Sequence, residues 1–441
     1  MGLDLTRRQF AGGFAITAAD MMARPAFARG EAKVVVIGGG AGGATVAGTL
    51  KVSNPALDVT LLEPQAKYTS CFFSNAYIGG FYSLADLTHG YSGLAKLGVT
   101  VIHDRAEKID TIKKTVDLQN KKQISYDRLV VSPGIDFKWS AIEGYSQSVA
   151  KTMPHAWRGG DQTFALRDRL EKMENGGTVV ITVPKLPYRC PPGPYERACV
   201  IAHYLKQAKP KSKLVILDAK MTFSKQSAFQ EAFEKYYKDI IEVHLSNDID
   251  DFTVARVDPG DGEIRTNAGF NIKAAVANII PPQTAGAICL QSGLADPEWC
   301  PIDPASFASS KAENVFVLGD SAIANEMPKS AFSAHSQGLA VAARIAAELD
   351  SRRPDPARYR NTCWSIVAPD DAIKIGADYA AGPLPGGING LVPSNAFVSK
   401  PGESAQERKA TYDEAFAWYP TLIGQIFKTE TRSKSSKVKA G

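Results

Sequence analysis

Six cysteines occur in this chain of 441 residues, and two of them stand in segments that favour chemistry over packing. Cys71 lies in "TSCFFSN", about eight residues beyond an expected strand that ends at Glu63, with no other cysteine near it. Cys190 lies in "YRCPPGPYE", a stiff proline-rich turn in which a purely structural cysteine is the alternative. A cysteine thiolate is both a nucleophile and a redox group. Both positions are therefore candidates for a covalent link or for electron transfer.

The other four cysteines carry weaker signals. Cys199 falls on the apolar stretch of an expected helix, which favours a buried thiol. Cys289 and Cys300 are close enough in the sequence to form a short structural disulfide in an oxidising compartment. Cys363, in "NTCWS", lies 173 residues after Cys190. Because six cysteines can pair in many ways, spacing alone assigns no partner to any of them.

The stretch "KVVVIGGGAGGATVAGTL" combines a buried strand, a glycine turn and a helix. The strand covers Val34–Ile37, the helix starts at Ala41, and "DVTLLEP" adds a second strand that ends at Glu63. The turn has the spacing G-x-G-x-x-G, at Gly38, Gly40 and Gly43. Such glycines permit a tight turn, the approach of a pyrophosphate and close packing of the helix on the strand. The pattern predicts a dinucleotide at the helix N-terminus, with Glu63 bonded to its ribose.

Two further segments bear on whether the bound dinucleotide is NAD or FAD. "AENVFVLGDSA" (residues 312–322) is an apolar strand that ends at Gly319–Asp320 and precedes a helix with small residues, and "YDRLVVSPG" (126–134) is a strand that leads into a turn. With the glycine turn, they resemble the FAD-binding family that includes disulfide reductases, type II NADH dehydrogenases and sulfide oxidoreductases. The resemblance implies that Asp320 bonds a ribitol hydroxyl of FAD. Capping of the following helix is a compatible alternative role for Asp320.

A second strand–turn–helix unit, at residues 175–207, lacks a phosphate-binding turn. The strand Thr178–Val183 and a helix from about Glu196 follow the expected pattern, but the turn between them contains five prolines and one glycine, Gly193. Proline removes the backbone N–H groups that would hold a phosphate. We expect this domain to keep its sheet without binding a nicotinamide nucleotide, so that electrons come from another donor.

Most of the chain, from about Lys33 to the final forty residues, resembles the flavoprotein subunit of flavocytochrome c sulfide dehydrogenase. The resemblance rests on the glycine turn and on "YTSCFFSN", "YRCPPGPYER", "FVLGDSA", "MPKSAFSAHSQG" and "NTCWS". It implies that Cys71 is bonded through a thioether to the 8α-methyl group of FAD, which would explain why Cys71 has no cysteine nearby. It also implies that Cys190 and Cys363 form a redox-active disulfide beside the flavin.

The same resemblance implies the oxidation of sulfide. Hydrosulfide would attack the disulfide as a thiolate does. We expect Cys190 to carry the persulfide and Cys363 to face the flavin, although the sequence does not separate these roles. Glu196 is a candidate to take the proton from sulfide, and an ordinary carboxylate at a helix start is an equal alternative. Lys329 is a candidate to stabilise negative charge on the reduced flavin ring, and a solvated surface lysine is the alternative. Trp364 is a candidate to shield the site, and simple core packing is the alternative.

Electrons from the flavin need a separate acceptor. The chain contains no C-x-x-C-H motif, so it has no c-type haem attachment of its own. In the family that this chain resembles, the acceptor haem belongs to a cytochrome c subunit, for which the sequence leaves one haem or two open. The six histidines show no metal-ligand spacing, and we expect no metal site.

These elements predict an α/β fold with two Rossmann-like nucleotide-binding domains, of the glutathione reductase type, and a small C-terminal α+β domain. We expect a discontinuous FAD-binding domain at residues 29–150 and 285–350. The second nucleotide fold, with its degenerate NAD site, would cover residues 151–284. Residues 351–441 would form the C-terminal domain, in which short strands and Gly/Pro turns precede a basic tail. We expect this domain to close the flavin site and to contribute to the cytochrome interface.

The first 28 residues predict an export signal. The pair Arg7–Arg8 precedes a short apolar run, and Ala26 and Ala28 give an A-x-A cleavage site. The apolar run, Ala11–Ala19, is too short for a membrane anchor, because a span needs about 20 apolar residues. The twin-arginine route carries folded proteins that already hold a cofactor. We therefore expect the mature protein in the periplasm, where disulfides persist.

Composition argues against two classes of partner. The net charge of +5 falls to about +4 without the predicted signal, too little to favour nucleic acid or an anionic membrane. No second apolar run reaches spanning length, so we expect no membrane span in the mature chain.

Three other functions compete with this hypothesis. A sulfide:quinone oxidoreductase would need an apolar or amphipathic C-terminus to reach quinone, and the tail here is basic and polar. An NADH-dependent disulfide reductase would need a close cysteine pair and an intact second glycine turn. A non-catalytic flavin-binding redox or assembly protein would be favoured by the loss of the redox cysteines, which are present.

Overall fold

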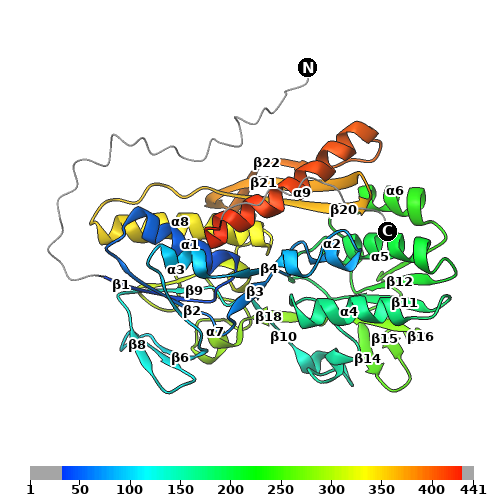
Figure 1. The fold of residues 1–441 in the computed structure, drawn as a ribbon, viewed down its shortest axis with the longest axis horizontal. Coiled ribbons are helices and arrows are strands. Elements are labelled where there is room, and N and C mark those ends of the chain that lie inside the picture. Colours follow the sequence, from blue (N-terminus) through cyan, green and yellow to red (C-terminus); the bar gives the residue numbers. More distant parts are fainter. Residues whose placement is uncertain (1–31, 430–441) are drawn as a thin grey trace.

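The computed structural model describes residues 32–429, which form two lobes and a C-terminal unit that lies over their junction (Figure 1). The predicted export signal (residues 1–28) and the end of the basic tail (430–441) lie outside the described residues. The structure confirms the predicted α/β fold class, while the predicted domain boundaries remain predictions. One continuous cluster of buried apolar side chains runs from the first sheet to the second, so the lobes share a core.

The first lobe is built on a five-stranded parallel sheet of order β19-β9-β1-β2-β5. Its strands are β1 (Lys33–Ile37), β2 (Asp58–Leu62), β5 (Thr100–Ile102), β9 (Arg128–Val131) and β19 (Val315–Val317). Strands of this kind are apolar runs because both faces of a parallel sheet are covered. Helices α1 (Ala41–Ser53) and α8 (Ala331–Leu349) lie side by side (Figure 1). Their close approach requires glycine, because a Cβ added at Gly338 would lie 2.8 Å from the Gly42 carbonyl oxygen.

Smaller elements complete the first lobe. An antiparallel meander consists of β6 (Ala106–Asp110), β7 (Thr115–Leu118) and β8 (Gln123–Ser125), and α7 (Ala287–Gln291) packs against β6. The other pieces are β3 (Lys67–Thr69), α2 (Ser74–Ile78), η2 (Ala85–Leu87), β4 (Thr88–Gly90), α3 (Ser92–Lys96) and η5 (Gly319–Ser321). The antiparallel pair β10 (Ile135–Phe137) and β18 (Gln283–Ala285) lies where the chain leaves this lobe and returns to it.

The second lobe repeats the strand–helix–strand plan. Its parallel sheet, of order β13-β12-β11-β17, contains β11 (Thr178–Val183), β12 (Lys213–Asp218), β13 (Ile241–Leu245) and β17 (Val276–Ile279). The helices are α4 (Asp161–Lys172), α5 (Gly193–Ala208) and α6 (Gln226–Tyr237), with η3 (Trp139–Ala141) and η4 (Val149–Lys151) before them. A second meander consists of β14 (Val254–Asp258), β15 (Glu263–Thr266) and β16 (Asn271–Lys273).

The C-terminal unit is an antiparallel sheet followed by one long helix. The strands are β20 (Tyr359–Ala368), β21 (Asp371–Pro383) and β22 (Asn389–Val398), and α9 covers Ala405–Phe427. The predicted short strands are wrong, since these have 10, 13 and 10 residues. Helix α9 begins with a capping box, in which the Ser404 side chain accepts from the Glu407 N–H and Glu407 accepts from the Ser404 N–H. In Figure 1 α9 runs across the junction of the lobes.

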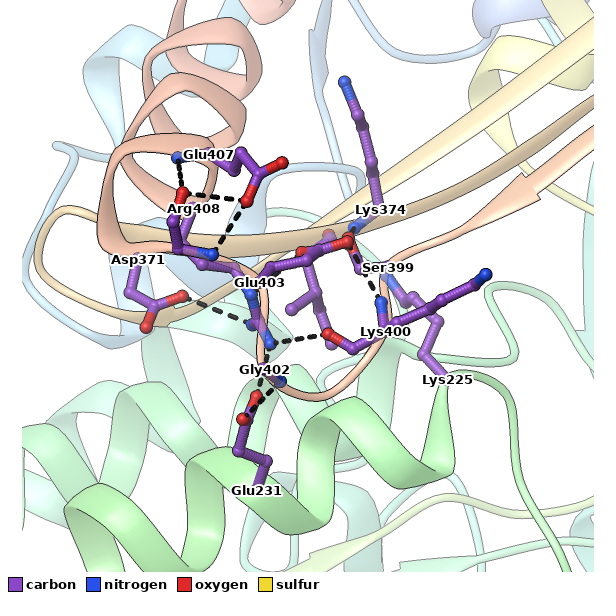
Figure 2. Close-up of polar contacts among 12 residues, drawn as sticks. Lys225, Glu231, Asp371, Lys374, Ser399, Lys400, Gly402, Glu403, Glu407 and Arg408 are labelled. Atoms are coloured by element: carbon purple, nitrogen blue, oxygen red, sulfur yellow. Dashed lines mark hydrogen bonds and ion pairs between the residues drawn. The ribbon is translucent and has the colours of Figure 1, made fainter.

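Arg408 holds the start of α9 against the second lobe (Figure 2). Its side chain is 5% exposed and is surrounded by three carboxylates. The guanidinium lies 2.5 Å from Glu231 on α6, 2.9 Å from Glu403 before α9 and 3.4 Å from Asp371 on β21. A buried cation needs such partners, because burial without them is costly. Within residues 32–429, no helix is both long and apolar enough to cross a bilayer.

Candidate functional site

A deep cavity lies where the two lobes and the C-terminal unit meet. The empty space between its lining atoms, including open solvent at the mouth, is about 1360 Å³. Nine of the candidate site residues from the sequence line it, namely Gly38, Gly40, Glu63, Cys71, Cys190, Glu196, Asp320, Cys363 and Trp364. The fold thus gathers side chains from both lobes and from β20 at one place.

The three glycines of the first turn have different physical tasks. Gly38 has φ +98°, and an added Cβ would lie 2.3 Å from the Ser132 carbonyl oxygen. A Cβ at Gly43 would lie 2.0 Å from the Gly38 carbonyl oxygen, so Gly43 allows α1 to pack on its own turn. Gly40 borders the cavity, where an added Cβ would come no closer than 3.7 Å to Tyr68. The start of α1 therefore opens onto the cavity, as an anion-binding helix N-terminus requires.

Glu63 stands at the end of β2 beside the glycine turn. One carboxylate oxygen accepts from the Gly39 N–H at 2.9 Å, and the other accepts from the Gln65 N–H at 3.0 Å. A carboxylate has about four acceptor positions, so two neutral N–H donors leave capacity for further hydrogen bonds. Glu63 is thus oriented by the turn and lines the cavity as the ribose prediction requires.

Asp320 in η5 carries a buried oxygen that lacks a hydrogen-bond donor among the described residues. Oδ1 has no partner, whereas Oδ2 lies 3.5 Å from Nη1 of Arg189. An unpaired buried carboxylate oxygen costs free energy, and a ligand hydroxyl could satisfy it. This atom, the glycine turn and the free helix start together fit a dinucleotide with a polyol chain, which FAD provides. The residues that would hold it are those of the glycine turn, Glu63 and Asp320.

Lys329 does not line the cavity, and its suggested role beside the flavin ring remains a prediction. Its ammonium donates to the carbonyl oxygens of Asp320 at 2.8 Å and Ala322 at 2.7 Å, and lies 3.9 Å from the centre of the Trp299 ring. Burial lowers the pKa of Lys329 to about 8. The position of Lys329 before α8 suggested a charge that faces the flavin ring. In the structure its ammonium is hydrogen-bonded to the carbonyl oxygens of Asp320 and Ala322. Lys329 therefore holds the backbone of η5 in place.

Cys71 and Cys190 reach the cavity from two loops. Cys71 is a half-buried free thiol between β3 and α2. Cys190 has φ +59°, a left-handed conformation that is strained for a residue with a side chain. Its N–H donates to the carbonyl oxygen of Lys329 at 2.9 Å, which ties the proline loop to the start of α8. Gly193 leaves room for the sulfur, since an added Cβ would lie 2.9 Å from the Cys190 Sγ.

Cys363 reaches the same cavity from β20, so the fold brings Cys190 and Cys363 together from segments 173 residues apart. Both are free thiols in this structure, and their pairing remains a prediction. Burial raises the pKa of each thiol above its ordinary value. The negative charge of Cys363 raises the pKa of Cys190 further, whereas the Lys225 ammonium lowers that of Cys363. Positive charge is thus placed to favour the thiolate at Cys363.

Glu196 lies in the first turn of α5, lines the cavity and also joins three elements. Its carboxylate accepts from the Ile366 N–H at 2.9 Å and from the Asn75 amide at 2.7 Å. Burial raises the pKa of Glu196, while these hydrogen bonds and the nearby cations oppose the shift. Both roles considered for Glu196 from the sequence are therefore compatible with its position. It can accept a proton, and it can act as a fixed negative charge at the start of α5.

Sequence analysis missed several residues of the site. Lys225 donates to Ser365 Oγ at 2.7 Å, and no local pattern indicates it. Arg189 is adjacent to Cys190 and faces Asp320, so a search for charges beside the cysteine would have found it. An apolar wall consists of Phe72, Phe73, Trp157, Phe332, Trp364 and Trp418. The lining role of Trp364 agrees with its suggested shielding of the site.

The corresponding place in the second lobe is filled with side chains. Asp218 ends β12, where a Rossmann fold offers a carboxylate to a ribose. Here it is fully buried, with Lys220 Nζ at 2.5 Å and the Tyr195 hydroxyl donating to it. Tyr188 closes the proline loop by donating to the Pro191 carbonyl oxygen at 3.0 Å. These contacts give a physical reason for the expected loss of a nicotinamide site.

The remaining cysteines lie outside the cavity lining. Cys199 is fully buried on α5, which confirms the predicted buried thiol. Cys289 and Cys300 are buried neighbours and are free thiols in this structure, not a disulfide. The hydrogen bond between them is the first cause that raises the pKa of Cys289. Within residues 32–429, no three His, Cys, Asp or Glu side chains are grouped so that they could hold a metal ion.

Three protein-family models match the chain. The model "Sulfide dehydrogenase [flavocytochrome c] flavoprotein chain, central" matches residues 163–281. The model "Flavocytochrome c sulphide dehydrogenase, flavin-binding" matches residues 355–427. The model "Pyridine nucleotide-disulphide oxidoreductase" matches residues 32–181. Together they cover both lobes and the C-terminal unit.

Known relatives fall into two groups. A sulfide dehydrogenase [flavocytochrome c] flavoprotein chain from Chlorobaculum thiosulfatiphilum is 49% identical over 47 residues, which are 11% of this chain and 98% of that sequence. A mitochondrial sulfide:quinone oxidoreductase from Dictyostelium discoideum is 24% identical over 299 residues, 65% of each chain. The match to its mouse counterpart also spans 66% of each chain. A sulfide-quinone reductase from Aquifex aeolicus is 24% identical over 87% of this chain and 90% of its own length.

Solved structures agree on the fold. The sulfide:quinone oxidoreductase of Aquifex aeolicus has a TM-score of 0.64 at 20% identity, covering 90% of this chain and 93% of that one. A ferredoxin reductase from Rhodopseudomonas palustris has a TM-score of 0.62 at 17% identity, and the match covers 84% of this chain and 89% of that one.

Proposed function

We propose that this chain, which belongs to the family of flavocytochrome c sulfide dehydrogenase flavoprotein chains, oxidises sulfide with FAD bound in this cavity. The observation that carries the proposal is the meeting of Cys190 and Cys363 at a cavity that also contains the glycine turn and the unpaired oxygen of Asp320. A thiol pair beside a flavin site is suited to two-electron sulfur chemistry. The filled site around Asp218 supports a donor other than a nicotinamide.

In the proposed reaction a disulfide joins Cys190 and Cys363. Hydrosulfide attacks Cys190 Sγ, a new sulfur–sulfur bond forms, the disulfide breaks, and the electron pair remains on Cys363 as a thiolate. A second hydrosulfide removes the outer sulfur as a disulfane and leaves two cysteine thiols. FAD, when bound, supplies the two-electron acceptor through which the disulfide is restored. Glu196 lines the same cavity as this pair and is the proposed acceptor of a proton released from hydrosulfide.

Further parts of the proposal concern the surroundings of the enzyme. We infer a thioether between Cys71 and FAD, because Cys71 is a half-buried thiol on the cavity wall. A c-type cytochrome chain with one or two haems is the proposed electron acceptor. The periplasm is the proposed location, on the strength of Arg7–Arg8 and the A-x-A site. A covalent bond would then prevent the loss of a cofactor that cannot be replaced there.

The covalent bond is tested by mass. The mature protein is precipitated with acid, denatured and washed, and its mass is compared with that of the bare chain. A yellow protein with a flavin-sized mass addition, absent in Cys71→Ala, is the expected result. A bare-chain mass in the unaltered protein would reject the thioether.

The reaction is tested by sulfide-dependent reduction of a small cytochrome c. Cys190→Ser and Cys363→Ser should each abolish turnover while the flavin spectrum remains. Cys199→Ala is the matched control, since Cys199 is a buried thiol outside the cavity lining, and it should retain turnover. Full turnover in Cys190→Ser would refute the disulfide route.

Sulfide:quinone oxidation is the second candidate, because the relatives matched over 65–90% of their lengths carry that name. A soluble quinone analogue offered in parallel with cytochrome c separates the two. A higher kcat/KM with the quinone would favour the second candidate.

A further inference from the structure

We propose that Lys225 is a positioning residue that keeps a buried positive charge beside Cys363 and thereby favours the thiolate on that sulfur. The inference deepens the proposed function and rests on it for its catalytic meaning, although the charge effect itself is measurable without sulfide. Lys225 lies outside the cavity lining and acts through Cys363.

Lys225 is fixed in an unusual position. It immediately precedes α6, has φ +60° and is 5% exposed. Its ammonium crosses from the second lobe to β20, where it donates to Ser365 Oγ at 2.7 Å and to the Cys363 carbonyl oxygen at 3.2 Å. A third acceptor, the carbonyl oxygen of Ile373 on β21, lies at 3.4 Å. These contacts attach the ammonium to the strand that carries Cys363.

The ammonium has neutral hydrogen-bond partners and no fixed counter-ion. Among residues 32–429, no carboxylate oxygen lies within 4.0 Å of its Nζ. A buried cation without an anion is costly, so such a charge is retained where an anion forms beside it. Arg408 shows the contrast, because it is equally buried and has three carboxylates around it. The groups whose negative charge acts most strongly on Lys225 are Cys363 and then Glu196.

The electrostatics of the two groups agree with this geometry. Burial lowers the pKa of Lys225 to about 8, and Cys363, Glu196, Cys190 and Cys199 raise it. Burial raises the pKa of Cys363, and Lys225 is the strongest influence that lowers it. The amide of Asn361 and the hydroxyl of Ser330 lower it as well, while Glu196 raises it. Removal of the Lys225 charge should therefore raise the pKa of the Cys363 thiol.

The experiment measures the alkylation of Cys363 as a function of pH. The holoprotein is reduced with dithiothreitol, treated with iodoacetamide between pH 6 and 10, and digested, and the labelled Cys363 peptide is quantified by mass spectrometry. Only the thiolate reacts, so the rate below the thiol pKa follows the thiolate fraction. A rise of about one pKa unit in Lys225→Gln would slow labelling about tenfold at pH 7. The difference should narrow above pH 8, where the wild-type ammonium loses its own proton.

Two variants separate charge from structure. Lys225→Arg keeps the charge and should retain the wild-type rate of Cys363 labelling at pH 7, where the wild-type ammonium is protonated. Lys374→Met is the matched control, because Lys374 lies on the neighbouring strand β21 and is paired with Glu414 instead of a cysteine. Loss of the Lys374 charge should leave the rate of Cys363 labelling at pH 7 unchanged. Glutamine is chosen at position 225 because its amide can still donate to Ser365, which protects the fold.

Equal labelling rates at pH 7 in wild type and Lys225→Gln would overturn the proposal. So would equal slowing in the Gln and Arg variants at every pH, which is the signature of a structural contact. Slower labelling of Lys225→Gln at pH 7, in a protein whose wild type does not oxidise sulfide, would leave the charge effect standing and refute the proposed function. Sulfide oxidation by the wild type, with equal labelling rates at pH 7, would support the proposed function and refute the charge effect.

Discussion

Loss of the Arg408 side chain should release the N-terminal half of α9 from the second lobe. In Arg408→Met, the carboxylates of Glu231, Glu403 and Asp371 lose their common cation (Figure 2). Removing one partner of a buried ion pair costs about 3–5 kcal/mol. The lower end applies here, because Glu231 and Glu403 are 35% and 25% exposed and can be solvated. Asp371 also keeps a hydrogen bond from the Tyr236 hydroxyl at 2.7 Å.

Hydrogen exchange followed by mass spectrometry measures this loss where it occurs. A cost of about 3 kcal/mol in local opening corresponds to an increase of roughly 100-fold in amide exchange along α9. Lys409→Met is the control in the same turn, since Lys409 is 46% exposed and its ion pairs with Asp413 and Asp370 lie at the surface. Exposed pairs contribute at most about 1 kcal/mol, or roughly fivefold in exchange. An effect of Arg408→Met no larger than that of Lys409→Met would refute the reasoning.

Three other outcomes follow from the structure. Gly43→Ala should yield protein with little flavin, because the added Cβ would lie 2.0 Å from the Gly38 carbonyl oxygen. Gly90→Ala is the control and should retain its flavin, since nothing lies within 4 Å of its added Cβ and Gly90 is outside the cavity lining. Bound-flavin absorbance per chain measures both, and equal flavin contents would contradict the reasoning. Because burial raises the pKa of Glu196, its ionisation destabilises the fold as pH rises from 4.5 through the raised value, so Glu196→Gln should gain stability relative to wild type over that range. Denaturant titrations at several pH values measure this gain, and a constant difference would count against it. Mild oxidation should join Cys289 to Cys300, since these thiols are hydrogen-bonded neighbours; peptide mapping that shows both alkylated after oxidant treatment would exclude the bond.

Local patterns predicted the parts of the site that depend on neighbouring residues. The glycine turn and Glu63 follow one another within a single strand–helix–strand unit, and their spacing alone places them at one edge of the sheet. Asp320 was identified in the same way, from the end of an apolar strand. Residue spacing could not show that Asp320 Oδ1 has no hydrogen-bond donor among the described residues, and this came from the structure.

Side-chain contacts and strand lengths that no linear pattern specifies account for what sequence analysis missed. Lys225 was missed because its partners Cys363 and Ser365 lie 138 and 140 residues away. The hydrogen-bond partners of Lys329 were not foreseen, because its neighbours on the chain suggest only where its Cα lies. The side chain turns to carbonyl oxygens and to the Trp299 ring, none of which a linear pattern orients. The long strands of the C-terminal unit were underestimated, since their glycines and prolines suggested frequent turns.

The wall that α9 gives to the cavity has a consequence for biosynthesis. The residues around the cavity extend from Gly38 to Trp418, so the site cannot close until nearly the whole polypeptide has left the ribosome. A large cofactor would enter most easily while Trp364 and Trp418 are still undocked. The ion cluster of Arg408 holds the start of α9 against the second lobe, so it also stabilises the position from which α9 supplies Trp418 to the cavity wall.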